Sequence, residues 1–301
     1  MLCNFMEVLN KAKQAGRQII SVAAAQDKDV LKAVKAAWDA DLAQAILVGD
    51  ADLIRPLLGE VGLPSDMPIV HEPEVGKAAI TAVSLVKAGK AQIFMKGLVN
   101  SSDFLKAVVN KELGLRTGHL LSHLSAYEVP GGEKLIFLTD SGMNVAPSQE
   151  EKKGILVNAI MAISALGIER PKVAVLAASE IVNPKIQATV DAKALADMYR
   201  QGEFYPAIVE GPIAMDVALS PEHAKHKGIT SEIAGNIDIF MIPNIEAGNI
   251  LSKALIHYAN FKNAGVIIGA THPVVMVSRA DSAEAKLYSI ALACLLAGAK
   301  Q

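Results

Sequence analysis

Aromatic side chains and cysteines are scarce in this 301-residue sequence, and no long apolar run occurs in it. Aromatic residues make up 4% of the chain although 51% of all residues are hydrophobic, which is typical of a globular core built from small aliphatic side chains. The two cysteines, Cys3 and Cys294, form no motif, so we expect reduced, non-catalytic thiols. The sequence has neither the roughly 20 consecutive apolar residues of a membrane span nor the apolar core of a signal peptide. We therefore expect a cytoplasmic protein that does not contact membranes.

An excess of charge of either sign is also missing. The chain has 29 basic and 31 acidic residues and a formal net charge of −2, which gives no electrostatic footprint for nucleic acid. It contains no Walker A loop, no GxGxxG fingerprint and no GxSxG elbow. These absences argue against the common nucleotide-hydrolysing, Rossmann dehydrogenase and hydrolase classes. Because the histidines form no HExxH arrangement and have no cysteines beside them, we expect no metal site.

What the sequence does contain is an alternation of short apolar runs and helical patterns. In the first third, the runs predict strands at 19–25, 45–50, 68–73 and 92–97, each followed by a helix. Two further β runs are separated by Pro130, Gly131 and Gly132, which indicates a hairpin. The spacing of Ser148 and Glu151 is that of a capping box and predicts the start of a helix. The alternation resumes at residue 172, and a further helix is predicted from Asn249 to Tyr258. This pattern predicts an α/β protein with two domains and largely parallel sheets.

Polar residues follow several of the predicted strands. In parallel α/β sheets, ligands bind beyond the carboxyl ends of the strands, so these residues are candidates for binding a substrate. Each could instead be a turn, capping or surface residue. The candidates are Lys96, Asp140, Asn144, Asp216, Gly248 and Asn249.

The segment from Gly269 to Lys286 carries the sharpest signal. An apolar run ends at Val277, and the sequence Ser-Arg-Ala-Asp-Ser follows and leads into a helix that starts near Ser282. An arginine, hydroxyl groups and the free N–H groups of a helix start provide what a phosphate or a developing oxyanion requires. A structural ion pair is the alternative explanation for Arg279, but bidentate phosphate recognition suits a guanidinium at this position. We therefore predict a site that handles phosphate.

Five ordered blocks of the sequence resemble the phosphate acetyl/butyryl transferases. They are Thr139–Pro147, Pro171–Ala192, Val209–Ser220, Ile242–Leu255 and Ser278–Ala293. The resemblance implies reversible transfer of a short acyl group between coenzyme A and phosphate, with butyryl-CoA and phosphate giving butyryl phosphate and CoA. It implies no permanently bound cofactor, no required metal, acyl-CoA and phosphate as partners, and a homodimer or larger homo-oligomer.

The resemblance also implies a fold. Members have two three-layer α/β/α domains like those of the isocitrate and isopropylmalate dehydrogenases, with the active site in the interdomain cleft. The last strand and helix return to the first domain in that family. This return and the turn-forming residues near Pro130 together predict one domain formed by residues 1–128 and 275–301 and a second formed by residues 129–274.

The catalytic pattern of the family carries over only in part. Ser278 matches a hydrogen-bonding serine and Arg279 matches an arginine that binds phosphate and the developing oxyanion, while Ser282 matches a following serine. In the acetyl-specific branch an aspartate proposed as general base comes next, but this sequence has Ala285 there. The variant found here looks like the butyryl branch.

The proton of the CoA thiol is therefore unassigned. A thiol with a pKa of about 8.5 must lose its proton to attack an acyl phosphate, and Asp281 and Glu284 are the nearest carboxylates in sequence. Both could instead be helix-capping residues, with Asp281 at the N-cap. We expect direct transfer in a ternary complex.

Three alternatives remain open. An acetyl group could be the main substrate, because one methylene changes specificity by only ~1 to 3 kcal/mol. The chain could be a metal- and NAD-dependent hydroxy-acid dehydrogenase that shares the fold. It could also be a catalytically silent regulator that binds acyl-CoA or phosphate.

Overall fold

The computed structural model describes residues 2–277 and 281–299, and the chain forms two compact units. Unit 1 consists of Met1–Asn4 and Leu120–Asn263, and unit 2 consists of Phe5–His119 and Ala264–Gln301. The chain crosses between the units after residues 4, 119 and 263, whereas the sequence-based limits are 128 and 274. The assignment of folding domains, like the expected position of the active site, stays a prediction.

Unit 2 contains a mixed sheet with the strand order β3-β2-β1-β4-β11-β10. Strands β1, β2, β3, β4 and β11 pair in parallel, and β10 is antiparallel to β11. The strands are β1 Gln18–Ala23, β2 Ala43–Gly49, β3 Ile69–His71, β4 Ile93–Lys96, β10 Lys262–Ile268 and β11 Val274–Val275. The predicted strands of the first third are therefore confirmed.

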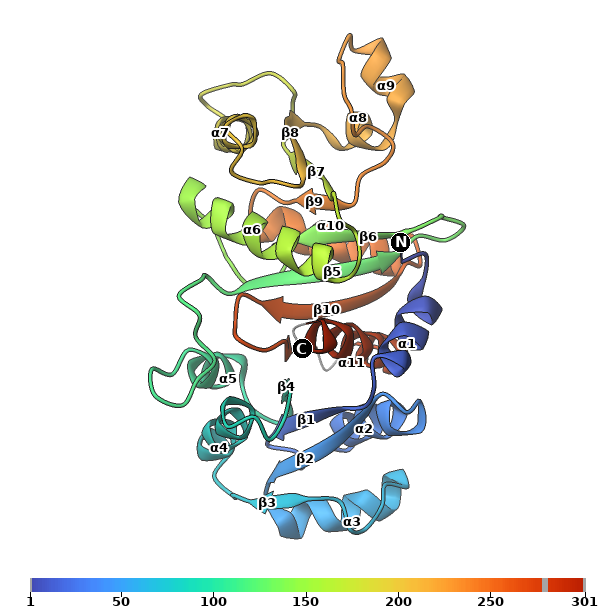
Figure 1. Ribbon diagram of the computed structural model, residues 1–301, viewed down its shortest axis with the longest axis vertical. Helices are drawn as coiled ribbons and strands as arrows, with labels where there is room; N and C mark the ends of the chain where they lie inside the picture. Colours follow the sequence, from blue (N-terminus) through green and yellow to red (C-terminus); the bar gives the residue numbers. More distant parts are fainter. Residues whose placement is uncertain (1, 278–280, 300–301) are drawn as a thin grey trace. The chain divides into compact units, whose positions relative to one another are not determined.

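Helices cover both faces of this sheet (Figure 1). Helices α4 Val75–Lys87 and α5 Ser101–Val108 contact each other on one face. The helices on the other face are α1 Phe5–Gln14, α2 Lys28–Asp39, α3 Ala51–Val61 and α11 Ala283–Gly298. Helix α2 begins where Asp27 accepts hydrogen bonds from the N–H groups of Asp29 and Val30, which identifies Asp27 as the capping residue.

Unit 1 has the strand order β5-β6-β9-β7-β8. β5 and β6 form the antiparallel hairpin that the sequence predicts, and β6, β9, β7 and β8 pair in parallel. The strands are β5 Ser122–Glu128, β6 Leu135–Thr139, β7 Lys172–Leu176, β8 Ile208–Ile213 and β9 Ile239–Met241. The helices are α6 Gln149–Ala165, α7 Gln187–Arg200, α8 Met215–Leu219, α9 Pro221–His226 and α10 Ile245–His257.

The core of unit 1 follows the register of its strands. Leu138, Phe240 and Ala174 stand opposite one another on β6, β9 and β7, and all three are fully buried in one apolar cluster. Leu251 and Leu255 of α10 pack against this cluster, whereas α6 and α7 contact one another and other parts of the sheet. Burying both faces of a parallel sheet in this way gives a three-layer arrangement.

The beginnings of two helices test the sequence-based interpretation. Ser148 and Glu151 form the predicted capping box of α6. The prediction that a helix begins at Asn249 is wrong, because Asn244 caps α10 by accepting a hydrogen bond from the N–H of Ala247. The described part of the chain contains no helix with the length and apolar character needed to cross a membrane.

Candidate functional site

The carboxyl ends of the parallel strands of unit 1 lie along one edge of its sheet. Because β5 runs antiparallel to β6, the first residues of β5 reach the same edge as the last residues of β6. The loop between β6 and α6 and the first turn of α10 are also joined there, since the N–H of Ile245 donates to the carbonyl oxygen of Val145. This edge is where the topology places a ligand site.

Asp140 organises the loop after β6. Its buried carboxylate accepts hydrogen bonds from the N–H groups of His123, Gly142 and Met143 and from the side-chain amide of Asn144 at 2.6 Å. The Asn144 amide also donates to the carbonyl oxygen of Leu121. A buried carboxylate needs such donors to offset its lost hydration. The two residues are thus brought together, and their substrate-binding role stays a prediction.

A histidine that the sequence analysis did not select lies beside this loop. The Nδ1 atom of His123 is 3.2 Å from the hydroxyl of Ser125 and 3.4 Å from that of Ser141, and the two hydroxyls are 2.9 Å apart. Both serines are buried, and the imidazole is half-buried. In the sequence, His123 is only a histidine at the start of a predicted β run, and it belongs to no motif. Its position beside the loop after β6 becomes apparent only when the hairpin has formed.

Gly248 lies within α10 rather than in a turn. A Cβ atom at this position would be 2.7 Å from the Cα of Ser141 and 3.1 Å from the Cγ2 of Ile242. The absence of a side chain therefore lets the first turns of α10 pack directly on the backbone of Ser141. The structure thus connects Gly248 with the cluster around Asp140, although through packing and not through a polar group.

An apolar cavity of about 310 Å³ adjoins the cluster. It lies beyond the ends of β7 and β9 and against the start of α10, and it shares Ile242 with the contacts of Gly248. Its lining is Leu176, Ala177, Ala178, Ile186, Ala188, Met215, Ile242, Pro243, Ala247 and Leu251. A concave apolar site beside a few converging polar groups is the usual form of a small-molecule site.

Two predicted residues of unit 1 face elsewhere. Asp216 forms an ion pair with Lys227, whose ammonium also contacts Glu180. The hydrogen bond from Lys227 holds the pKa of the exposed Asp216 carboxyl below its usual value. Asn249 is exposed on α10. In the described part of the chain, neither residue forms a hydrogen bond with the cluster around Asp140, and a substrate role for either stays a prediction.

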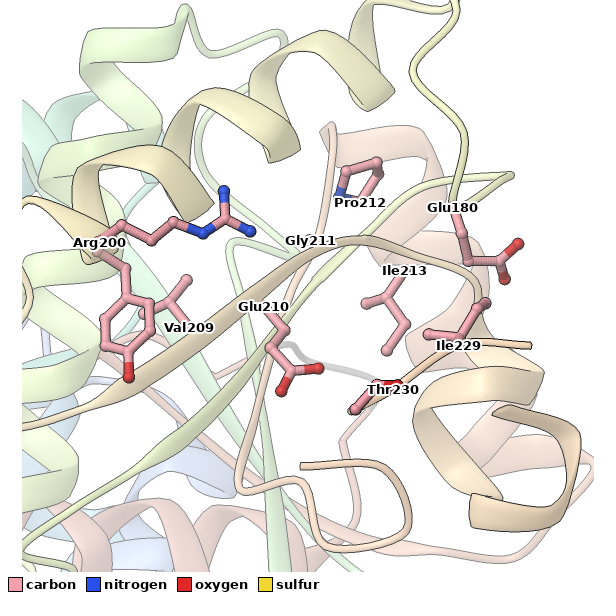
Figure 2. A pocket seen from close by; sticks show the side chains of 10 residues that line it. Glu180, Arg200, Val209, Glu210, Gly211, Pro212, Ile213, Ile229 and Thr230 are labelled. Atoms are coloured by element: carbon pink, nitrogen blue, oxygen red, sulfur yellow. The ribbon is translucent and has the colours of Figure 1, made fainter. Parts of the chain in front are cut away.

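A second cavity in unit 1, of about 330 Å³, runs along β8 (Figure 2). Figure 2 shows Arg200, Glu210 and Glu180 among its lining side chains. Glu210 accepts hydrogen bonds from the hydroxyl of Ser231 and the N–H of Glu232, and Arg200 donates to Asp197. The charged groups of this cavity are therefore engaged in local structure, which makes it a weaker candidate than the edge near Asp140.

In unit 2, Lys96 is the last residue of β4 and is half-buried. A Cβ atom on the next residue, Gly97, would lie 2.4 Å from the carbonyl oxygens of Ala23 and Ala24, so this turn requires glycine. Strand β11 pairs in parallel with β4, with Val275 opposite Met95. Both strands therefore end on the same edge of unit 2. Ser278 and Arg279 follow shortly after β11 but lie outside the described residues.

The three remaining predicted site residues lie at the start of α11 and have different local roles. Ser282 is the N-cap, because its hydroxyl accepts a hydrogen bond from the N–H of Ala285 at 3.1 Å. The alternative that placed Asp281 at the N-cap is therefore wrong. Glu284 is exposed in the first turn and accepts a hydrogen bond from the hydroxyl of Tyr288 at 3.5 Å. The catalytic roles of Asp281 and Glu284 stay predictions.

These positions give a first testable prediction. Replacing Ser282 with alanine removes the cap of α11, and we expect the free energy of unfolding to fall by about 1 kcal/mol. Replacing Asp281 with asparagine should leave it within about 0.5 kcal/mol. Urea denaturation of both variants measures the difference. Equal losses would mean that Ser282 does not cap the helix.

Cysteine and metal chemistry receive no support from the described residues. Burial raises the pKa of the Cys294 thiol to about 12, so it is not a reactive thiolate at neutral pH. Within residues 2–277 and 281–299, no three His, Cys, Asp or Glu side chains are grouped so that they could hold a metal ion.

Comparisons with known proteins point to one family. The family model described as "Phosphate acetyl/butaryl transferase" matches residues 62–294. The phosphate butyryltransferase of Clostridium acetobutylicum is 47% identical over 301 residues, which is 100% of both chains. A branched-chain phosphotransacylase from Enterococcus faecalis has a similar structure, with a TM-score of 0.83, 34% identity and coverage of 93% of this chain and 99% of that one.

The fold is shared more widely. The 4-hydroxythreonine-4-phosphate dehydrogenase of Klebsiella pneumoniae aligns with a TM-score of 0.59 at 15% identity, covering 94% of this chain and 100% of that one. This likeness concerns the fold alone, and it agrees with the dehydrogenase-like α/β architecture expected from the sequence.

Proposed function

This chain belongs to the phosphate acetyl/butyryl transferase family, and we propose that it transfers a butyryl group between coenzyme A and inorganic phosphate. The observation that carries the proposal is the 47% identity along the whole chain to a phosphate butyryltransferase. In this reaction, butyryl-CoA and phosphate give butyryl phosphate and CoA, and the reaction is reversible.

We propose a chemical role for the predicted site residues of each unit. In unit 2, Arg279 binds the phosphate and the oxyanion that develops on the acyl carbonyl, Ser278 donates a hydrogen bond, and Lys96 adds positive charge. Preorganised donors of this kind are the largest single contribution in many acyl-transfer enzymes. In unit 1, the loop held by Asp140 and Asn144 contributes to substrate binding.

We assign the acyl chain to the apolar cavity of unit 1. Its volume of about 310 Å³ and its lining by aliphatic side chains suit a short hydrocarbon chain. It adjoins Ser141 through Gly248 and Ile242, so an acyl chain there would end beside the polar cluster. A substrate with a charged acyl group would lose its hydration in this cavity without a compensating partner.

This assignment gives a specificity prediction. Met215 lines the cavity and is half-buried. Replacing Met215 with alanine should raise kcat/KM for hexanoyl-CoA relative to butyryl-CoA by roughly 10-fold, because a methylene in an apolar pocket changes discrimination by ~1 to 3 kcal/mol. The smaller cavity of Ala177→Val should shift preference toward acetyl-CoA. If the ratios of kcat/KM between these acyl-CoA substrates stayed unchanged in both variants, the acyl chain would not bind in this cavity.

The transfer itself is proposed to be direct. Phosphate attacks the thioester in a ternary complex, and no acyl group is attached to the protein. Incubation of butyryl-CoA with labelled CoA in the absence of phosphate should therefore give no exchange of label. Exchange, or an acylated side chain found by mass spectrometry, would establish a covalent intermediate instead.

The same function can be tested against its rivals. We expect release of free CoA from butyryl-CoA with phosphate and without added metal, and a lower kcat/KM with acetyl-CoA. The reverse preference would favour a phosphate acetyltransferase, since the family description includes both substrates. Binding of acyl-CoA without turnover would favour a silent regulator, and loss of activity with a chelator would favour the dehydrogenase alternative.

The proposal also covers the location, the assembly and the cofactors of the enzyme. We propose that it acts in the cytoplasm as a homodimer or larger homo-oligomer, with coenzyme A as a substrate and no permanently bound cofactor. Light scattering of the purified protein measures the assembly, and a monomer at micromolar concentration would contradict this part.

A further inference from the structure

The loop between β7 and α7 borders the apolar cavity of unit 1 at both of its ends. Ala178 and Ile186 line that cavity, so residues 179–185 leave its rim and return to it. Within this loop, Ile181 is 76% exposed and Val182 is 41% exposed. Adjacent exposed apolar side chains beside an apolar cavity are typical of a surface that a ligand covers.

Hydrogen bonds fix the loop on both sides of these two side chains. The N–H of Ile181 donates to the hydroxyl of Ser179 at 3.1 Å. The N–H of Asn183 donates to the hydroxyl of Thr189 at 2.9 Å, and the same hydroxyl is 3.1 Å from the carbonyl oxygen of Asn183. Thr189 is fully buried. Because the backbone is held in this way, a ligand meets Ile181 and Val182 as a preorganised apolar surface.

An ion-pair network connects this loop to the end of α9. The Nζ of Lys227, the residue after α9, is 3.2 Å from Oε1 of Glu180 and 3.0 Å from Oδ2 of Asp216. Asp216 follows Met215, which lines the apolar cavity. The rim of the cavity, the loop and the end of α9 are therefore joined within unit 1.

A further cavity of unit 1, of about 410 Å³, lies beside α9. Its lining is Pro221, Ala224, Lys225, Gly228, Ile229, Thr230, Ser231 and Ala234. The cavity along β8 shares Ile229 and Thr230 with it and is also lined by Glu180 (Figure 2). The two cavities therefore form one recess, which we call the α9 recess, and it reaches from the β7–α7 loop to Lys225.

Resting on the proposed function, we propose that the coenzyme A arm of the substrate binds along the β7–α7 loop and the α9 recess. With the acyl group in the apolar cavity, the pantetheine part of the arm, which carries a pair of methyl groups, packs on Ile181 and Val182. The phosphate groups at the far end of the arm lie beside Lys225. Binding of this remote part of the substrate holds the thioester in position for transfer.

The charges of the α9 recess suit an arm that is polar in the middle and anionic at its end. Glu180 is paired with Lys227, and Glu210 accepts hydrogen bonds from the hydroxyl of Ser231 and the N–H of Glu232. The carboxylates along the path are therefore engaged by the protein. At the far end, the exposed ammonium of Lys225 provides the point charge with which lysine binds phosphate.

The test shortens the arm in steps. Butyryl-pantetheine lacks the nucleotide and its phosphates, and butyryl-N-acetylcysteamine also lacks the part with the methyl groups. Combining Ile181→Ser with Val182→Ser should lower kcat/KM about 10-fold for butyryl-CoA and for butyryl-pantetheine, and leave it within about twofold for butyryl-N-acetylcysteamine. Lys225→Gln should lower it about 5-fold for butyryl-CoA alone. Release of free thiol in the presence of phosphate measures each rate.

Matched substitutions elsewhere in unit 1 are the controls. Met161→Ser replaces an apolar side chain that is 61% exposed on α6, and Lys193→Gln removes an exposed charge from α7. Both should keep kcat/KM within about twofold of the unmodified protein for all the thioesters. A shortened thioester that turns over too slowly is compared by its inhibition constant against butyryl-CoA.

The pattern across the thioesters decides the outcome. The proposal is overturned if either variant keeps kcat/KM for butyryl-CoA within about twofold of the unmodified protein. An equal loss with all the thioesters also overturns it, because the defect then lies in the fold or in the acyl site and not in binding of the arm. If the unmodified protein releases no thiol from butyryl-CoA, the proposed function fails instead.

Discussion

Replacing Arg279 with lysine is expected to lower kcat for acyl transfer by ~100- to 1,000-fold and to leave the fold unchanged, which is the effect of removing one oxyanion donor in other acyl-transfer enzymes. The guanidinium offers two parallel N–H groups to a phosphate, and the ammonium of lysine offers a point charge on a flexible stem. The measurement is release of free CoA at saturating butyryl-CoA and phosphate, together with a thermal unfolding curve.

The control for this variant is Arg200→Lys. Arg200 is an exposed arginine at the end of α7 that pairs with Asp197, and its replacement should change turnover by less than twofold. If Arg279→Lys also retained turnover within twofold, Arg279 would have no part in the reaction. The resemblance of the Ser-Arg-Ala-Asp-Ser segment to the family's catalytic pattern would then carry no mechanistic weight.

The largest expected effect on stability concerns the buried ion pair between α6 and α7. The Nζ of Lys152 is 2.6 Å from Oδ2 of Asp191, and the side chains are 7% and 5% exposed. Gln187 donates to the other oxygen of Asp191. Replacing Lys152 with methionine should lower the free energy of unfolding by about 3 to 5 kcal/mol, because it leaves a buried carboxylate without its cation.

Two comparisons make this prediction specific. Lys153 is the next residue and pairs with Glu203 at a more exposed position, so Lys153→Met should change the free energy of unfolding by less than about 1 kcal/mol. Adding Asp191→Leu to Lys152→Met removes the unpaired carboxylate and should recover part of the loss. Urea denaturation measures all four proteins. A Lys152→Met effect equal to that of Lys153→Met would show that burial does not matter here.

The fold could be predicted well because its signals are local. Alternating apolar runs and helical patterns predict the α/β class. The turn-forming residues Pro130–Gly132 predict the hairpin of β5 and β6. Helices α8 and α9, of 5 and 6 residues, escaped prediction because they are too short to show a helical period. The start of α10 was misplaced because Asn244 and Asn249 are both plausible caps in the sequence, and the hydrogen bond that Asn244 accepts from the N–H of Ala247 identifies Asn244 as the cap.

The site was less predictable because it depends on contacts between distant segments. Position after a strand drew attention to Asp140 and Asn144, which a hydrogen bond joins in the structure, and their substrate-binding role stays a prediction. The same rule cannot tell them from Asp216, whose partner Lys227 lies on a helix end that the sequence did not predict. His123 was missed as a candidate because its two serine partners meet it only after the hairpin has formed and the following loop has folded.

The most direct test of the account is to mix the protein with butyryl-CoA in the presence of a chelator and to measure free thiol and acyl phosphate with and without inorganic phosphate. Acyl phosphate is trapped as the hydroxamate for this purpose. We predict that thiol is released only when phosphate is present, and that each mole of thiol is accompanied by one mole of butyryl phosphate. Thiol release without phosphate, or none under either condition, would contradict transfer of an acyl group to phosphate.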